Sequence, residues 1–164
     1  MAILNCAAVA AAANDSERFK TLYDFALIAD AAYQGKAGVE KVLAEQGFVL
    51  TAHGQLPGYG VSYYLATNDS TKRQILSVRG TSNVENAMVD AAFQLLPNDH
   101  TGIKLHQGFA LSADYIYDKV KDRLNKNYRI DTTGHSLGGA VALILAMYLD
   151  ASGYDVGRVI TFCL

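Results

Sequence analysis

The chain of 164 residues has the length of about one domain, and with 51% hydrophobic and 18% charged residues it is too apolar for a disordered segment. Its formal net charge of −2 excludes a basic surface for nucleic acid and a polybasic membrane patch. No apolar run reaches the roughly 18 to 20 residues of a membrane span, so we do not expect an integral membrane protein.

The first residues of the chain have two interpretations. Residues 1–13 are apolar and alanine-rich, as in a signal-like or disordered segment, but a secretory signal normally begins with a basic residue and the first one here is Arg18. The alternative is the apolar start of a helix, so a secreted and a cytoplasmic protein both stay open. Asn14 and Glu17 resemble a capping box, and apolar residues at helical spacing predict a helix from there to about Gly35.

The next part of the chain predicts a short helix and then strands. The helix covers about residues 39–46, with Gly47 as its C-terminal stop. Segments rich in β-branched and aromatic residues predict strands at residues 48–52, 61–67 and 73–78. The last two flank Asn68-Asp69-Ser70, whose side chains favour a tight turn, and together they predict a β-hairpin.

After the hairpin, residues 82–96 predict a short helix plus a loop that ends at Pro97, and residues 98–106 are polar and turn-like. The remaining sequence alternates between the two element types: an amphipathic helix over 109–125, a strand over 128–133, a buried helix over 137–149 and a strand over 158–162. This alternation predicts an α/β fold, with a mixed, mainly parallel sheet, right-handed crossovers and the hairpin at one side.

The chemical signal lies between the strands predicted at residues 128–133 and 158–162. Residues 134–138 read Gly-His-Ser-Leu-Gly, directly after a predicted strand and directly before a buried helix. In a nucleophile elbow the chain reverses so tightly that side chains at 134 and 138 would collide, and glycine removes the Cβ atom. The helix N-terminus presents free N–H groups there. The pattern therefore predicts Ser136 as a nucleophile; a glycine-rich helix start without chemistry is the alternative.

Four segments in order resemble the class 3 lipases, the family of the filamentous-fungal triacylglycerol lipases. TGHSLGGAVAL at 133–143 resembles the family's nucleophile elbow, VRGTS at 78–82 its oxyanion strand end, HQGF at 106–109 the start of its next helix and FALIADAAY at 25–33 its N-terminal helix. The resemblance covers about residues 19–162. It implies an α/β-hydrolase fold and a serine ester hydrolase of lipid metabolism that forms an acyl-enzyme, needs no cofactor or metal, and acts on a lipid ester at a lipid–water interface.

The resemblance also implies roles for single residues. The backbone N–H groups of Leu137 and Thr81 would form the oxyanion hole, although Thr81 is also consistent with a plain turn residue at a strand end. Residues 82–96 would take the place of the family's lid, with a buried loop helix as the alternative, and Asp90 would have a structural role. The other motif residues are expected to shape the site without acting as a base: Arg79, Gly80, His106, Gly134, His135, Gly138 and Gly139.

The sequence departs from the family after the serine. In α/β hydrolases the acid and the histidine follow the nucleophile, but all four histidines here precede Leu137. We therefore expect residues 1–164 to be a single, incomplete lipase-like domain that stops after the strand that follows the nucleophile helix. The alternative function is a catalytically dead lipid-binding or assembly module. An apolar sheet edge would then favour self-association.

Overall fold

Five strands form one mixed sheet in the computed structural model, which describes residues 3–58, 60–80 and 95–162, with backbone only for residues 3–14. The order across the sheet is β1-β2-β3-β6-β7. The strands are β1 (Val49–Gln55), β2 (Ser62–Asn68), β3 (Arg73–Arg79), β6 (Arg129–His135) and β7 (Asp155–Phe162). Neighbours are antiparallel from β1 to β3 and parallel from β3 to β7. The predicted mixed sheet, with the hairpin at one side, is confirmed.

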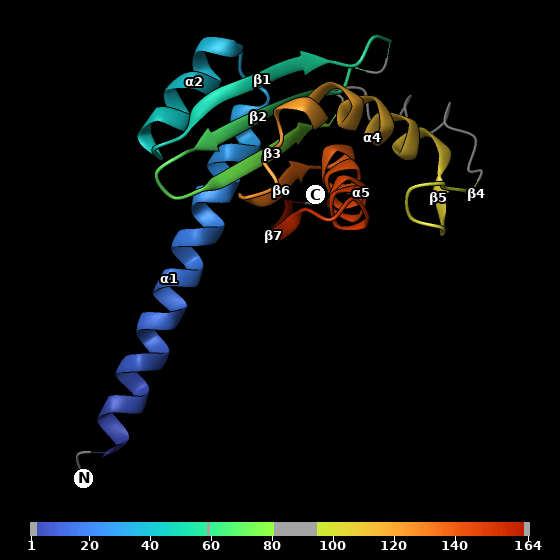
Figure 1. Cartoon of the computed structure of the whole chain (residues 1–164). Helices are drawn as coiled ribbons and strands as arrows, with labels where there is room; N and C mark the ends of the chain where they lie inside the picture. The colour runs from blue at the N-terminus through green and yellow to red at the C-terminus, as the bar shows by residue number, and fades with distance from the viewer. Residues whose placement is uncertain (1–2, 59, 81–94, 163–164) are drawn as a thin grey trace.

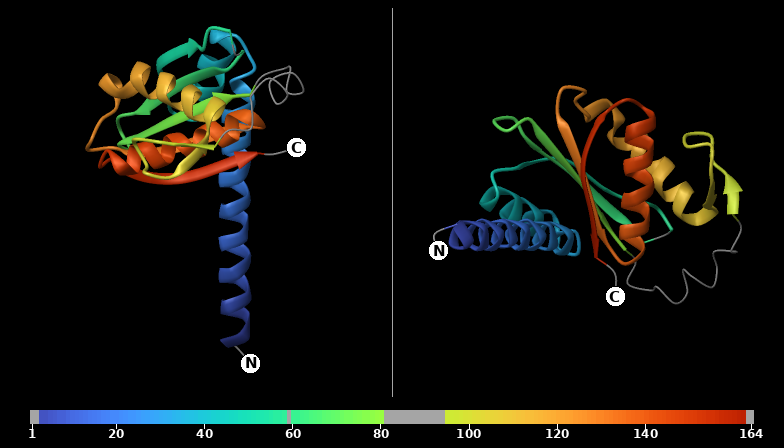
Figure 2. Two further views of the ribbon diagram at one scale, coloured as in Figure 1. Left: turned by 90° about the vertical axis from the view of Figure 1, so that its right-hand side faces the viewer. Right: turned by 90° about the horizontal axis from the view of Figure 1, so that it is seen from below.

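Helices cover both faces of this sheet (Figures 1 and 2). One face packs against α1 (Ile3–Ala31) and α2 (Lys36–Glu45), and the other against α4 (Gln107–Val120) and α5 (Leu137–Ala151). The reason is the alternation of side chains along β2, since successive residues of a strand point to opposite faces. Tyr64 and Ala66 join the α1–α2 core, whereas Tyr63 and Leu65 join the α4–α5 core.

The turn of the β2–β3 hairpin is held by the side chain of Asn68. Its Oδ1 accepts hydrogen bonds from the backbone N–H of Thr71 at 2.9 Å and from the hydroxyl of Ser70 at 2.7 Å. An asparagine that bonds the backbone ahead of it is a common device of tight turns. The predicted hairpin and its turn are therefore confirmed.

The predicted start of α1 at a capping box is wrong. The helix begins at Ile3 and runs through Asn14 without interruption, because the alanines before Asn14 have the highest helix propensity of any residue. Its first half extends away from the sheet (Figure 1). Whether residues 1–13 serve as a signal stays a prediction.

The end of α2 follows the prediction for Gly47. This glycine has φ +76°, and its N–H donates to the carbonyl of Ala44 at 3.1 Å, while the N–H of Phe48 donates to that of Leu43 at 2.8 Å. This pair of bonds is a Schellman motif, which turns the chain from the helix into β1.

The segment before α4 is only partly described. Leu95 and Leu96, predicted as the end of a helix plus loop, instead begin the strand β4 (Leu95–Pro97), which pairs with β5 (Lys104–His106). Asn98, between these two strands, donates its backbone N–H to Ile103 and accepts from Gly102, closing a small hairpin. Residues 82–94 of the predicted lid lie outside the described residues.

The helix predicted over residues 109–125 ends earlier. α4 stops at Val120 and a 3-10 turn, η1 (Lys121–Arg123), follows. The buried Gln74 of β3 explains this end, because its side chain donates to the carbonyl of Arg123 at 2.9 Å and accepts from the N–H of Asn125 at 2.8 Å. A side chain from another element thus satisfies backbone groups that a longer helix would use itself.

Candidate active site

Ser136 occupies the sharp reversal between β6 and α5. Its backbone has φ 55° and ψ −132°, and Lys72 is the only other non-glycine with positive φ in the described part of the chain. Such a conformation costs on the order of 1–3 kcal/mol, so the surroundings must enforce it. Two hydrogen bonds do so: the N–H of Ser136 donates to Phe162 at 2.8 Å, and its carbonyl accepts from Gly139 at 2.8 Å. The side chain is half-buried at the end of the sheet.

Glycines at 134 and 138 are required by the close approach of three backbone segments. A Cβ atom on Gly134 would lie 2.4 Å from the carbonyl oxygen of Gly138, and one on Gly138 would lie 2.3 Å from that of Val78. Real Cβ atoms do not approach other atoms that closely. Gly139 is less constrained, with the Cβ of Thr161 at 3.1 Å. Strand, reversal and helix therefore touch as an elbow requires.

The end of β3 lies beside the reversal. Arg79 is the register partner of His135, and a Cβ on the next residue, Gly80, would lie 2.9 Å from the carbonyl oxygen of His135 and 3.3 Å from the nitrogen of Leu137. The chain thus leaves β3 next to the backbone N–H of Leu137 at the start of α5. Thr81, Ser82 and Asp90 lie outside the described residues, so the second oxyanion donor stays a prediction.

Tyr33, near the end of α1, contacts the elbow from the other side. Its hydroxyl lies 2.8 Å from Nδ1 of His135, and the two rings meet edge to face. The guanidinium of Arg79 lies over the tyrosine ring at 5.8 Å and also donates to the carbonyl of Gly60. Burial raises the pKa of Tyr33, partly offset by a hydrogen bond from the backbone of Gly80. From the sequence, Tyr33 is placed only at the end of the segment that resembles the family's N-terminal helix, with no role at the site.

His106 stands at the N-cap position of α4, and its ring contacts that of Phe109 in a tilted arrangement, with 4.5 Å between the centroids. It is half-buried, and its role in shaping the site stays a prediction. Among the described residues no group of three or more His, Cys, Asp or Glu side chains could hold a metal ion. Over the same residues no helix is both long and apolar enough to cross a membrane.

The family model described as "Lipase (class 3)" matches residues 75–163. The secreted mono- and diacylglycerol lipase 1 of Fusarium solani is 33% identical over 102 residues, which cover 58% of this chain and 31% of that protein. Human diacylglycerol lipase-alpha is 32% identical over 108 residues, covering 56% of this chain and 10% of that one. The chain thus spans about a third or less of these relatives.

Solved lipase structures share the fold. The nonglycosylated LIP2 lipase of Yarrowia lipolytica superposes with a TM-score of 0.71 and 26% identity, over 89% of this chain and 58% of that one. Lipase II of Rhizopus niveus gives a TM-score of 0.72 at 22% identity, over 87% of this chain and 61% of that one. The predicted α/β-hydrolase-type fold is confirmed.

Proposed function

Because the chain belongs to the class 3 lipase family, we propose that it provides the nucleophile and the oxyanion hole of a lipid-ester hydrolase, with Ser136 as the nucleophile. The observation that carries this proposal is the strained backbone of Ser136, which sits at the tip of a strand-to-helix reversal. Glycine spacing alone is a weak signal, but a serine held at φ 55° by backbone contacts from three segments has no evident use in packing.

In the proposed reaction the Oγ of Ser136 attacks the carbonyl carbon of an ester and loses its proton to a general base. The carbonyl oxygen becomes an oxyanion, which the backbone N–H of Leu137 and that of Thr81 would stabilise. One such donor contributes about 3–4 kcal/mol to the stability of the transition state. The intermediate then expels the alcohol, which takes up the proton, and leaves an acyl group on Ser136. Water releases the acyl group as a carboxylic acid.

Tyr33 supports this geometry without touching the reacting atoms. Through its hydrogen bond to His135 and its contacts with Arg79 and Gly80, it connects the two loops that carry the oxyanion donors. We assign it as a positioning residue. The remaining motif residues have the same kind of role: the glycines at 80, 134 and 138 permit the close approach, and Arg79 fixes the end of β3.

The substrate is assigned to the glycerol esters of fatty acids. Relatives that bear the names mono- and diacylglycerol lipase and diacylglycerol lipase-alpha support this class. We place residues 1–164 within one lipase-like domain. No base is assigned, because all four histidines of this sequence precede Leu137. The second candidate function is a lipid-binding module of the same fold without ester turnover.

A fluorophosphonate probe, which phosphonylates activated serines, distinguishes these functions. The chain would be labelled with and without added imidazole, which supplies a base, and the modified residue mapped by mass spectrometry. We expect one label, on Ser136, that disappears in Ser136→Ala and persists in Ser70→Ala, a change in the exposed β2–β3 turn. Equal labelling of the Ser136→Ala protein, or no label even with imidazole, would contradict the hydrolase and leave the binding module.

A further inference from the structure

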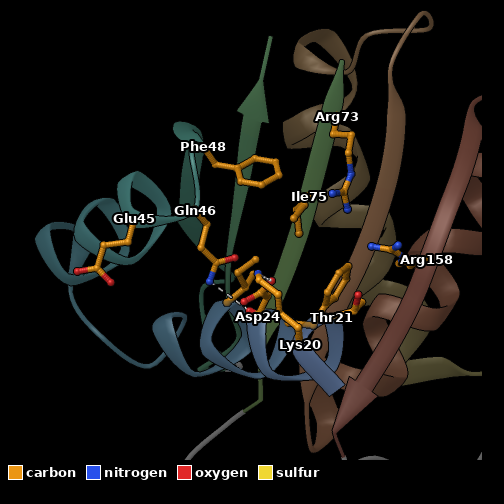
Figure 3. A pocket seen from close by; sticks show the side chains of 11 residues that line it. Lys20, Thr21, Asp24, Glu45, Gln46, Phe48, Arg73, Ile75 and Arg158 are labelled. Atoms are coloured by element: carbon orange, nitrogen blue, oxygen red, sulfur yellow. Dashed lines mark hydrogen bonds and ion pairs between the residues drawn. The ribbon is translucent and has the colours of Figure 1, made fainter. Parts of the chain in front are cut away.

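A cavity of about 340 Å³ lies between α1 and the sheet, on the face opposite α5. It is lined by α1, by the corner between α2 and β1, by the start of β3 and by Arg158 of β7 (Figure 3). Arg73 stands at the first residue of β3, whereas the neighbouring parallel strand β6 ends at His135, next to Ser136. The cavity is therefore at the other end of the sheet from the candidate nucleophile. Its volume lies in the range of small-molecule sites, roughly 300–1,000 Å³.

Two arginines converge on one end of this cavity (Figure 3). Arg73 donates to a carboxylate oxygen of Asp131, which is almost completely buried, and its guanidinium lies 6.0 Å from the ring centroid of Phe48. The other carboxylate oxygen of Asp131 accepts from the backbone N–H of Arg158 at 2.6 Å. The carboxylate of Asp131 is thus bonded to the guanidinium of Arg73 and to the backbone N–H of Arg158.

The charge at this end is therefore unbalanced by one positive unit. Within the described residues no carboxylate lies at ion-pair distance from the guanidinium of Arg158, and the carboxylate of Asp131 pairs with Arg73. The other charged groups of the cavity do not change this balance. Lys20 is paired with Asp24 at 2.6 Å, and Glu45 points away from the arginines (Figure 3).

The wall beside the two arginines is apolar. Phe25, Ile28, Phe48 and Ile75 line it, and each is at most 7% exposed. An apolar wall that ends in two guanidinium groups, of which only that of Arg73 is paired among the described residues, suits a molecule with an alkyl chain and an anionic head group. Neither a plain polar anion nor an uncharged alkane would use both parts of the site.

We propose that this cavity binds a fatty-acid carboxylate, with its head group on Arg158 and the free N–H donors of Arg73 and its alkyl chain along the apolar wall. Binding itself is independent of catalysis. The link between the two rests on the proposed function: lipid-ester hydrolysis releases this class of molecule, so the cavity would hold product away from Ser136.

Titration calorimetry with decanoate below its micelle concentration tests the site, with decyl phosphate and decanol as comparison ligands. We expect saturable binding of decanoate to wild type and to Ser136→Ala, and binding about tenfold weaker to Arg158→Gln, which removes the exposed cation but keeps its backbone bond to Asp131. Lys104→Gln, an exposed cation of β5, is the matched control and should bind as wild type does. Thr21→Phe, which places a ring in the cavity mouth, should abolish binding.

If decyl phosphate bound at least tenfold more tightly than decanoate, the preferred head group would be a phosphate and not a carboxylate. That result would overturn the proposal. Decanol binding as tight as that of decanoate, or unchanged binding in Arg158→Gln, would also overturn it. If Ser136→Ala no longer bound decanoate, the ligand would be bound at the candidate active site and not in this cavity, which would also overturn the proposal. Since no arm of this experiment uses ester turnover, its failure would leave the serine-labelling result untouched, and the reverse also holds.

Discussion

Replacement of Gly138 by alanine tests the packing of the elbow. The added Cβ would lie 2.3 Å from the carbonyl oxygen of Val78, 2.7 Å from the nitrogen of Gly80 and 2.8 Å from the carbonyl carbon of Arg79. All three are backbone atoms of β3 and the residue after it, so no side-chain rotation relieves the clash. Overpacking of a buried site typically costs about 1–3 kcal/mol, and rigid neighbours place this case at the upper end.

Part of the cost of this clash is offset, because alanine is about 1 kcal/mol more favourable than glycine inside a helix. We therefore expect the free energy of unfolding to fall by about 2 kcal/mol. With a urea m-value of about 2 kcal/mol/M, the midpoint of urea unfolding falls by about 1 M.

The matched control is Gly35→Ala at the N-cap of α2. Gly35 has φ −66°, which alanine adopts freely, and a Cβ atom added to it would meet open space, with no contact within 4 Å. Alanine is a weaker N-cap than glycine, which destabilises the protein, but it makes the unfolded chain less flexible, which stabilises it. The free energy of unfolding should therefore change by no more than about 0.5 kcal/mol. If Gly138→Ala were as stable as this control, three segments would not meet at the elbow as described.

Three further predictions concern single side chains. Ser136→Gly should raise the free energy of unfolding by about 1 kcal/mol in urea titrations, because relief of positive-φ strain outweighs the flexibility of glycine, whereas Ser136→Ala should not. Tyr33→Phe should shift the ¹⁵N resonance of Nδ1 of His135 and cost about 1 kcal/mol for the lost hydrogen bond. Burial raises the pKa of Tyr64 above its ordinary value of 10.0. Above about pH 10 the unfolded state therefore loses a proton that the folded state keeps, and the free energy of unfolding should fall as the pH rises further. Tyr64→Phe removes the hydrogen bond from the Tyr64 hydroxyl to the carbonyl of Ile28, so it should lower the free energy of unfolding at neutral pH. It should also make the fall in stability above about pH 10 smaller.

Local patterns were sufficient to predict the sheet and the elbow. The β2–β3 hairpin follows from apolar strands around Asn68, and the glycines at 134 and 138 follow from the space that an elbow leaves. The Asn68 turn and the contact between Gly134 and Gly138 act over a few neighbouring residues, so they are visible in a short stretch of sequence. The contact of Gly138 with the distant Val78 is not.

Contacts between distant residues were not predictable in this way. Tyr33 and His135 are 102 positions apart, and nothing near either residue in the sequence indicates the other. The early end of α4 has the same origin, since it depends on Gln74 of a distant strand. The cavity near Arg158 likewise exists only once α1, β3 and β7 are assembled.

The most direct test of Ser136 as a nucleophile is a crystal structure of the fluorophosphonate-treated protein. We expect a phosphorus atom bonded to Oγ of Ser136, with one phosphoryl oxygen about 2.7–3.1 Å from the backbone nitrogen of Leu137. An adduct on another residue, or a phosphoryl oxygen directed into solvent away from Leu137, would contradict this expectation.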